Sequence, residues 1–157
     1  MPWGAATLVL MFDIERDPSA VELGVFAPQP PTVVWRALVE PDLMQSWLSR
    51  PIGFEPVEGT SFLVEVLSEP PHHVACQVLT VVPRTRLVYT WTDPRGDAPA
   101  TWTVDWHLEA QGRGTRVLLV FSGFDMNDRI QKMARNAVER GWRNQVLPSL
   151  LASVASL

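Results

Sequence analysis

The chain has 157 residues, of which 46% are apolar and 19% are charged. This length is enough for one domain with a sizeable core, and the proportions are ordinary for a globular protein. The net charge of −4 excludes the strongly basic character that nucleic-acid-binding domains show, so we expect no nucleic-acid partner.

The N-terminal segment gives the weakest pattern. Residues 5–12 form an apolar run that is far shorter than the ~20 residues of a membrane span, and no basic residue precedes it. We therefore predict neither a signal peptide nor a membrane span. Residues 1–17 are interpreted as an N-terminal extension, with an edge strand, a segment packed on a partner chain and an upstream tail as open alternatives. Residues 18–157 are predicted to form one domain.

A strand and two short helices are predicted next. Residues 20–26 alternate between apolar and other side chains, which predicts the first strand. Proline is tolerated in the first turn of a helix, so Pro30 or Pro31 is expected to open a short helix over residues 32–39. A second short helix is expected over residues 42–48.

Consecutive strand patterns fill the middle of the chain. Apolar residues alternate with other residues over 61–66, 74–82, 87–91, 101–109 and 116–121, with short turns between them. Five or six such strands in succession predict an antiparallel meander with one buried face and one solvated face. The predicted buried face is rich in aromatic residues: Phe62, Tyr89, Trp91, Trp102, Trp106 and Phe121.

The last stretch, residues 125–157, has the period of an amphipathic helix. Asp125 or Asn127 is expected to cap it, and Pro148 predicts a kink or break near residues 144–147. A glycine inside a helix is unfavourable, so Gly141 is expected to permit close packing against a neighbouring Trp, with close approach of a strand, another bulky side chain or a ligand as the alternatives. One buried helix face is predicted to contain Ile130, Met133, Ala134, Ala137, Val138, Gly141 and Trp142.

Short motifs occur in the same order as these elements. The first helical pair has the run 34–38, then residues 41–43 and Trp47. The central strands have Val78, Val81, Pro83 and the run 86–91; the last strand and helix have 114–117, 122–124 and 141–142. Over residues 20–155 the chain resembles the START-like (SRPBCC) superfamily, and most closely the family named after the activator of heat-shock protein 90 ATPase. The first 17 residues and Pro148 depart from that family's pattern.

This resemblance implies an α+β helix-grip fold. A curved antiparallel β-sheet would wrap around a long C-terminal α-helix, and two short helices would follow the first strand. Members of the superfamily hold apolar molecules in a cavity between the sheet and this helix. The expected function is therefore binding of a small hydrophobic or aromatic molecule, although a filled core is the alternative explanation of the aromatic face.

The predicted walls of this cavity combine the sheet's aromatic face with the helix stripe. Tyr89 has the only phenol in the chain and is the expected polar contact of the ligand. The candidate ligand-binding residues are Trp47, Phe62, Val64, Tyr89, Trp91, Trp102, Trp106, Phe121, Met133, Val138 and Trp142.

Other reactive side chains are interpreted as structural. Cys76, the only cysteine, excludes an internal disulfide, favours a cytoplasmic protein and is expected to behave as a buried hydrophobe. The pair His72 and His73 is expected in an exposed loop. Asp105, His107 and Glu109 share one strand face, expected to be the solvent face. No catalytic residue, metal site or cofactor is predicted.

Two other functions stay open. The first is an enzyme of the cyclase, aromatase or hydrolase type, which would place a reactive substrate in the same cavity and use Tyr89. The second is a module that regulates a chaperone ATPase in the stress response, which the family name alone suggests. A homodimer is an open alternative to a monomer.

Overall fold

The computed structural model describes residues 17–68, 70–96 and 98–157. The predicted N-terminal extension, residues 1–17, lies outside the described residues except for Asp17. Among the described residues, none of the helices combines the length and the apolar character that crossing a membrane requires.

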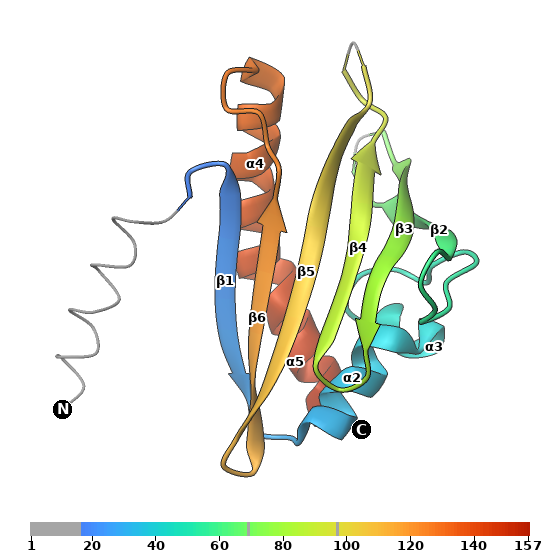
Figure 1. The fold of residues 1–157 in the computed structure, drawn as a ribbon, viewed down its shortest axis with the longest axis vertical. Helices are drawn as coiled ribbons and strands as arrows, with labels where there is room; N and C mark the ends of the chain where they lie inside the picture. Colours follow the sequence, from blue (N-terminus) through green and yellow to red (C-terminus); the bar gives the residue numbers. More distant parts are fainter. Residues whose placement is uncertain (1–16, 69, 97) are drawn as a thin grey trace, which may run out of the picture.

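One antiparallel sheet with strand order β1-β6-β5-β4-β3-β2 is the centre of the fold (Figure 1). The strands are β1 (Ala20–Ala27), β2 (Ser61–Val66), β3 (His72–Val82), β4 (Arg86–Asp93), β5 (Ala100–Gln111) and β6 (Gly114–Ser122). The predicted meander is confirmed for β2 to β6, and β1 forms one edge of the sheet by pairing with β6, Val21 opposite Phe121.

The alternation of side chains explains which face of the sheet carries the core. In β5, Trp102, Val104, Trp106 and Leu108 are buried, and the residues between them are not. Successive side chains of a strand point to opposite faces, so this pattern commits one face to the core. The helices cover that face, and the overall architecture is an α+β helix-grip fold, as predicted.

Two short helices follow β1. The first, α2 (Pro31–Val39), begins at a proline as expected. The second, α3 (Pro41–Met44), is only four residues long, so the predicted helix over 42–48 was too long. Beyond it the indole Nε1 of Trp47 donates a 2.8 Å hydrogen bond to the carbonyl of Ala37, which fixes this segment against α2.

The C-terminal helix is divided into three parts: α4 (Arg129–Gly141), the π-helical η1 (Trp142–Val146) and α5 (Leu147–Ala155). Asp128 caps α4 by accepting from the backbone N of Ile130 and Gln131, which corrects the expected cap at Asp125 or Asn127. Pro148 has no N–H to donate, and the predicted irregularity before it takes the form of η1, where Leu147 N bonds to Trp142 O.

The two ends of this helix pack very differently. In α5, Leu147, Leu150, Ser153 and Val154 are buried. All residues of α4 are described and none is buried: Ile130 is 54% exposed and Met133 63%. The predicted burial of the stripe along α4 was therefore wrong: Ala134 and Val138 are only partly buried against the core, and of the predicted stripe only Trp142, just after α4, is buried.

Side-chain hydrogen bonds attach α4 to the sheet on both sides. On one side, Arg135 Nη2 donates to the carbonyl oxygen of Ala20 at 2.9 Å, which ties α4 to the edge strand β1. On the other side, Trp102 Nε1 in β5 donates to Gln131 Oε1 at 3.1 Å. The helix is thus attached to the sheet at polar points, and Ala134 and Val138 are only partly buried against the core.

Candidate functional site

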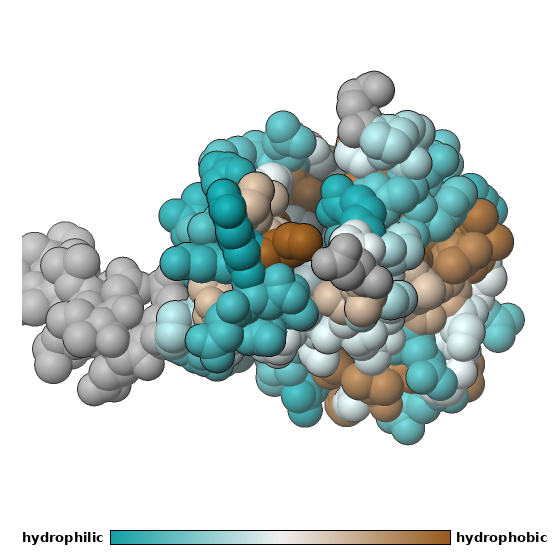
Figure 2. Space-filling model, turned by 90° about the horizontal axis from the view of Figure 1, so that it is seen from above, coloured by the Kyte–Doolittle hydropathy of each residue, from teal (hydrophilic) through white to brown (hydrophobic). Residues whose placement is uncertain are grey.

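Two adjoining pockets occupy the space between α4 and the sheet. The rim pocket, about 630 Å³, lies between α4, which lines it as far as Arg140, and the connection from β4 to β5. The aromatic pocket, about 460 Å³, reaches from there toward η1 and the segment after α3. They share walls at Asp93, Arg95, Trp102, Ala134 and Ala137. Figure 2 looks onto this end of the molecule and shows apolar surface recessed between hydrophilic side chains.

Four tryptophans line the aromatic pocket: Trp47, Trp91, Trp102 and Trp142. Trp142 contacts Trp91 with ring centroids 5.8 Å apart in an edge-to-face arrangement. Their indoles are held by the core behind them, and each is at most 6% exposed. The opposite wall is the helix stripe of Ala134, Ala137, Val138 and Gly141, whose small side chains leave the space open.

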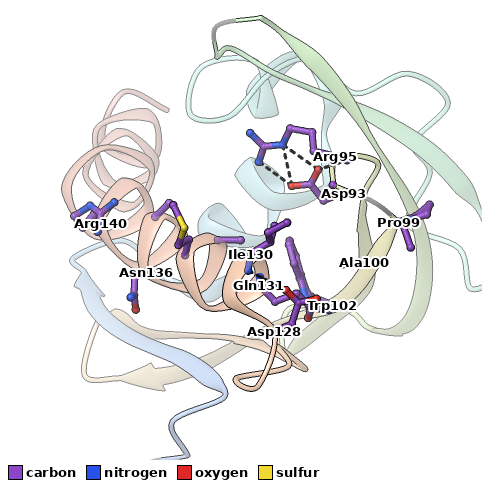
Figure 3. A pocket seen from close by; sticks show the side chains of 15 residues that line it. Asp93, Arg95, Pro99, Ala100, Trp102, Asp128, Ile130, Gln131, Asn136 and Arg140 are labelled. Carbon is purple, nitrogen blue, oxygen red and sulfur yellow. Dashed lines mark hydrogen bonds and ion pairs between the residues drawn. The ribbon is translucent and has the colours of Figure 1, made fainter.

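An ion pair lies where the two pockets meet (Figure 3). Asp93 ends β4 with a side chain that is only 7% exposed. It accepts hydrogen bonds from the backbone N of Arg95 at 2.9 Å and from the guanidinium Nε and Nη2 at 2.8–3.2 Å. Burial alone would raise the pKa of Asp93, but the hydrogen bonds and charge of Arg95 outweigh it, so this pKa is lowered and the carboxylate is ionised.

His72 lines the aromatic pocket close to this ion pair. Its Nδ1 lies 3.0 Å from the hydroxyl of Ser68. Burial and the positive charge of Arg95 lower the pKa of His72, against the opposing effect of Asp93, so the imidazole is neutral at neutral pH. The expected exposed loop was therefore wrong for both residues, because both lie in β3: His72 is half-buried, and only His73 is exposed as predicted.

The predicted ligand-binding residues fall into two groups. Six line the pockets: Trp47, Trp91, Trp102, Val138 and Trp142 in the aromatic pocket and Met133 in the rim pocket. The other five are buried in the core behind the pocket walls: Phe62, Val64, Tyr89, Trp106 and Phe121. A role of either group in ligand binding stays a prediction, and the second group would act by supporting the walls.

The Tyr89 hydroxyl has a protein partner. Trp106 Nε1 donates a hydrogen bond to it at 3.1 Å, and both side chains are buried. Burial raises the pKa of the phenol well above its ordinary value. In this structure Tyr89 lies outside the lining of both pockets, so its predicted polar contact with a ligand would require a rearrangement.

Gly141 has a different environment from the one predicted. Its backbone is ordinary right-handed helix, and no described atom beyond its own helix lies within 4 Å of the position that a Cβ would take. The expected close packing against a Trp was therefore wrong. The missing side chain leaves space that belongs to the aromatic pocket.

The sequence interpretation missed the polar residues of the site. Asp93 and Arg95 belong to a Pro- and Gly-containing stretch with an obvious turn pattern, and such stretches are usually solvated. One signal was available: Asp93 continues the inward alternation of Leu87, Tyr89 and Trp91 along β4. A carboxylate in phase with three buried residues predicts a buried charge, which requires a partner.

Of the groups interpreted as structural, Cys76 and the set Asp105, His107 and Glu109 lie outside the pockets, whereas His72 lines one of them. Cys76 is buried, and burial raises the pKa of its thiol to about 12. Asp105 pairs with Arg86 at 2.8 Å and with His107 at 3.1 Å on the opposite face of the sheet. Within residues 17–68, 70–96 and 98–157, His, Cys, Asp and Glu side chains form no cluster of three or more that could hold a metal ion.

Known structures with the same fold are numerous. Protein MLL2253 from Mesorhizobium loti is 27% identical, with a TM-score of 0.78 over 87% of this chain and 97% of that one. Protein CV1439 from Chromobacterium violaceum is 22% identical, with a TM-score of 0.75 over 88% and 98%. The Aha1 dimer from Colwellia psychrerythraea, solved in solution, is 14% identical, with a TM-score of 0.68 over 86% and 95%.

Sequence comparison identifies the family. No protein of curated function matches the chain. The family model described as activator of Hsp90 ATPase homolog 1-like protein matches residues 28–154, which includes every element from α2 to most of α5. This agrees with the motifs noted in the sequence and with the helix-grip fold. The chain therefore belongs to the activator of Hsp90 ATPase homolog 1-like family of the START-like superfamily.

Proposed function

We propose that this protein binds a small hydrophobic or aromatic molecule in the aromatic pocket. The observation that carries the proposal is the apolar stripe of α4, which is not fully buried and lines the same pocket as Trp47, Trp91, Trp102 and Trp142. A helix with such a stripe is normally stabilised by packing it against a core. Here that surface is available to a ligand.

The size and composition of the pocket support this function. A volume of about 460 Å³ falls within the range of small-molecule sites, which are mostly apolar and contain a few polar groups. Each Å² of apolar surface removed from water contributes roughly 25 cal/mol, so covering the α4 stripe and the indole faces would favour binding. The alternative of a filled core fits α5, in which Leu147, Leu150 and Val154 are buried, better than α4, in which no residue is fully buried.

The first test fills the pocket from the helix side. Ala137 lines both pockets, so Ala137→Phe would place a ring in the space that the ligand would occupy. The matched control is Ala152→Phe, which makes the same change on the exposed face of α5. Native mass spectrometry of freshly purified protein, compared with the denatured mass, would measure bound ligand and oligomeric state together.

We expect a discrete extra mass on the unchanged protein and on Ala152→Phe, and none on Ala137→Phe. An extra mass retained equally by both variants would place the ligand elsewhere and contradict the proposal. If every sample shows only the mass of the bare protein, the protein would next be titrated with an apolar fluorescent probe. If the probe does not bind either, the proposed function is wrong.

An enzyme remains the second candidate because ionisable groups line the pocket. Asp93 and His72 lie on its wall, whereas the expected acid–base group, Tyr89, lies in the core. A cyclase-, aromatase- or hydrolase-like reaction would require one of these wall groups to reach a substrate proton. Loss of turnover in His72→Gln with ligand binding retained would support catalysis. Unchanged turnover in both His72→Gln and Asp93→Asn would count against it.

The chaperone-regulating alternative rests on the family description alone. A pull-down that retains a heat-shock ATPase would favour it, and loss of that retention in a surface variant of α4 would locate the contact. Our proposal otherwise assumes a cytoplasmic protein without a nucleic-acid partner.

A further inference from the structure

The junction of the two pockets contains a carboxylate whose hydrogen-bonding capacity is already in use. Both oxygens of Asp93 accept from Arg95, through its backbone N, its Nε and its Nη2. With its carboxylate 7% exposed, Asp93 offers a ligand almost no free acceptor surface. Asp93 therefore serves to orient the guanidinium and to balance part of its charge.

The polar atoms left unused at this junction are donors. Arg95 Nη1 has no partner among the described residues, and the Arg95 side chain is 59% exposed. Figure 3 shows this guanidinium extending into the opening between α4 and the strands. On the facing helix, Gln131 Oε1 is occupied by Trp102 and by the backbone N of Asp125, which leaves the amide nitrogen of Gln131 without a described partner.

Two further carboxylates line the pockets, and their negative charge would repel an anionic ligand. Asp128 uses its Oδ1 to cap α4, so the partial positive charge of the helix start offsets its own charge. Glu65, on β2, lines the aromatic pocket and is exposed to solvent, which screens it. Arg140, on the rim, is a second cation in the pocket lining, and it has no described partner. The hydrogen-bond donors of Arg95 should therefore decide whether the junction favours an anionic or a neutral ligand group.

Building on the proposed function, we infer that the site prefers amphipathic anions over neutral apolar molecules. The apolar body would lie among Trp91, Trp102 and Trp142, and the acidic group would bind Arg95. Charge-assisted hydrogen bonds from a guanidinium are about twice as strong as neutral ones, and its fork matches a carboxylate or sulfonate. Because Arg95 is partly exposed, the preference should weaken at high salt.

Two probes with one aromatic body test this preference. Anilinonaphthalene sulfonate has an acidic group, and N-phenyl-1-naphthylamine is its neutral counterpart. Energy transfer from the pocket tryptophans would give a dissociation constant for each probe. We expect the sulfonate to bind about tenfold more tightly than the neutral probe at low salt, and this ratio to fall as salt is added.

Variants of the ion pair assign the preference to Arg95. Arg95→Met should remove the tenfold preference, so that the dissociation constants of the two probes come within about twofold of each other. Since this variant leaves Asp93 without its cation, the double variant Asp93→Asn with Arg95→Met provides a folded neutral junction and should give the same result. Arg113→Met removes one arginine from the β5–β6 turn, outside both pockets, and should preserve the preference.

The outcomes separate this inference from the proposed function. Equal affinity for the two probes, or a preference that survives both Arg95 variants, would overturn the anion inference and leave apolar binding supported. If Arg113→Met lost the preference for the sulfonate equally, the net charge of the protein would explain that preference. This result would overturn the inference as well. Binding of neither probe would remove the proposed function together with the inference built on it.

Discussion

The indole Nε1 of Trp102 in β5 donates a hydrogen bond to Gln131 Oε1 in α4 across 3.1 Å. The same oxygen accepts from the backbone N of Asp125 at 2.8 Å. One amide thus links the sheet, the loop before α4 and the helix itself. This link fixes α4 against β5 beside the rim pocket, which both Gln131 and Trp102 line.

Gln131→Ala removes that link. We expect the free energy of unfolding to fall by only about 1 kcal/mol, because the side chain is half-buried and the helix is otherwise solvated. Amide hydrogen exchange in α4 should accelerate, while exchange in α5 stays unchanged. Lys132→Ala, on the exposed side of the same turn, is the control, and equal acceleration in both variants would contradict a specific role of Gln131.

Tyr89→Phe separates the core role of the phenol from a catalytic one. The change leaves the buried N–H of Trp106 without its partner, which should cost about 1–3 kcal/mol in urea unfolding. Ligand affinity should stay within about twofold, because Tyr89 lies outside the lining of both pockets. Unchanged stability with lost turnover would instead support the enzyme alternative.

Gly141→Ala should stabilise the protein. The residue is helical and a Cβ there would meet open space, so the substitution adds helix propensity without a clash. The expected gain is about 0.5–1 kcal/mol, measured as a rise in the denaturation midpoint. Gly114→Ala is the contrasting case, because its Cβ would approach the carbonyl oxygen of Ala27 to 2.5 Å. A loss of stability in Gly141→Ala would show that the glycine has a packing role after all.

The Asp93 ion pair predicts how stability depends on pH. The pKa of Asp93 is lower in the folded protein than in the unfolded chain, so its stabilisation is complete above the unfolded value of 3.8 and is lost as the pH falls through the folded value. Asp93→Asn should cost about 1 kcal/mol at neutral pH and progressively less below about pH 4. Urea unfolding at a series of pH values measures this difference, and a difference independent of pH would exclude a titrating ion pair.

Cys76 should be inert in the folded protein. Burial raises the pKa of its thiol to about 12, so the reactive thiolate is scarce, and the side chain is only 4% exposed. Ellman's reagent should therefore react slowly with the native protein and rapidly in guanidinium chloride above the unfolding transition. Fast reaction under native conditions would mean that the core around Cys76 opens readily.

The sequence alone determined the strands, the amphipathic C-terminal helix and the family. Alternation in β5 is a local property of the chain, and so is the missing N–H of Pro148, which placed the irregularity that appears as η1. Both features are present in the folded protein, because any packing that buries the aromatic face must keep the alternation of the strand and cannot supply the missing N–H.

Tertiary structure alone decided how closely the helix approaches the sheet. The apolar period of α4 shows which side of the helix is apolar, but not whether a partner surface fills the space opposite it. That space depends on distant contacts: Arg135 with Ala20, and Gln131 with Trp102. Likewise, Asp93 and His72 meet only because the strand pairing of β3 with β4 brings their ends together. The open pocket and its ion pair are therefore properties of the assembled fold.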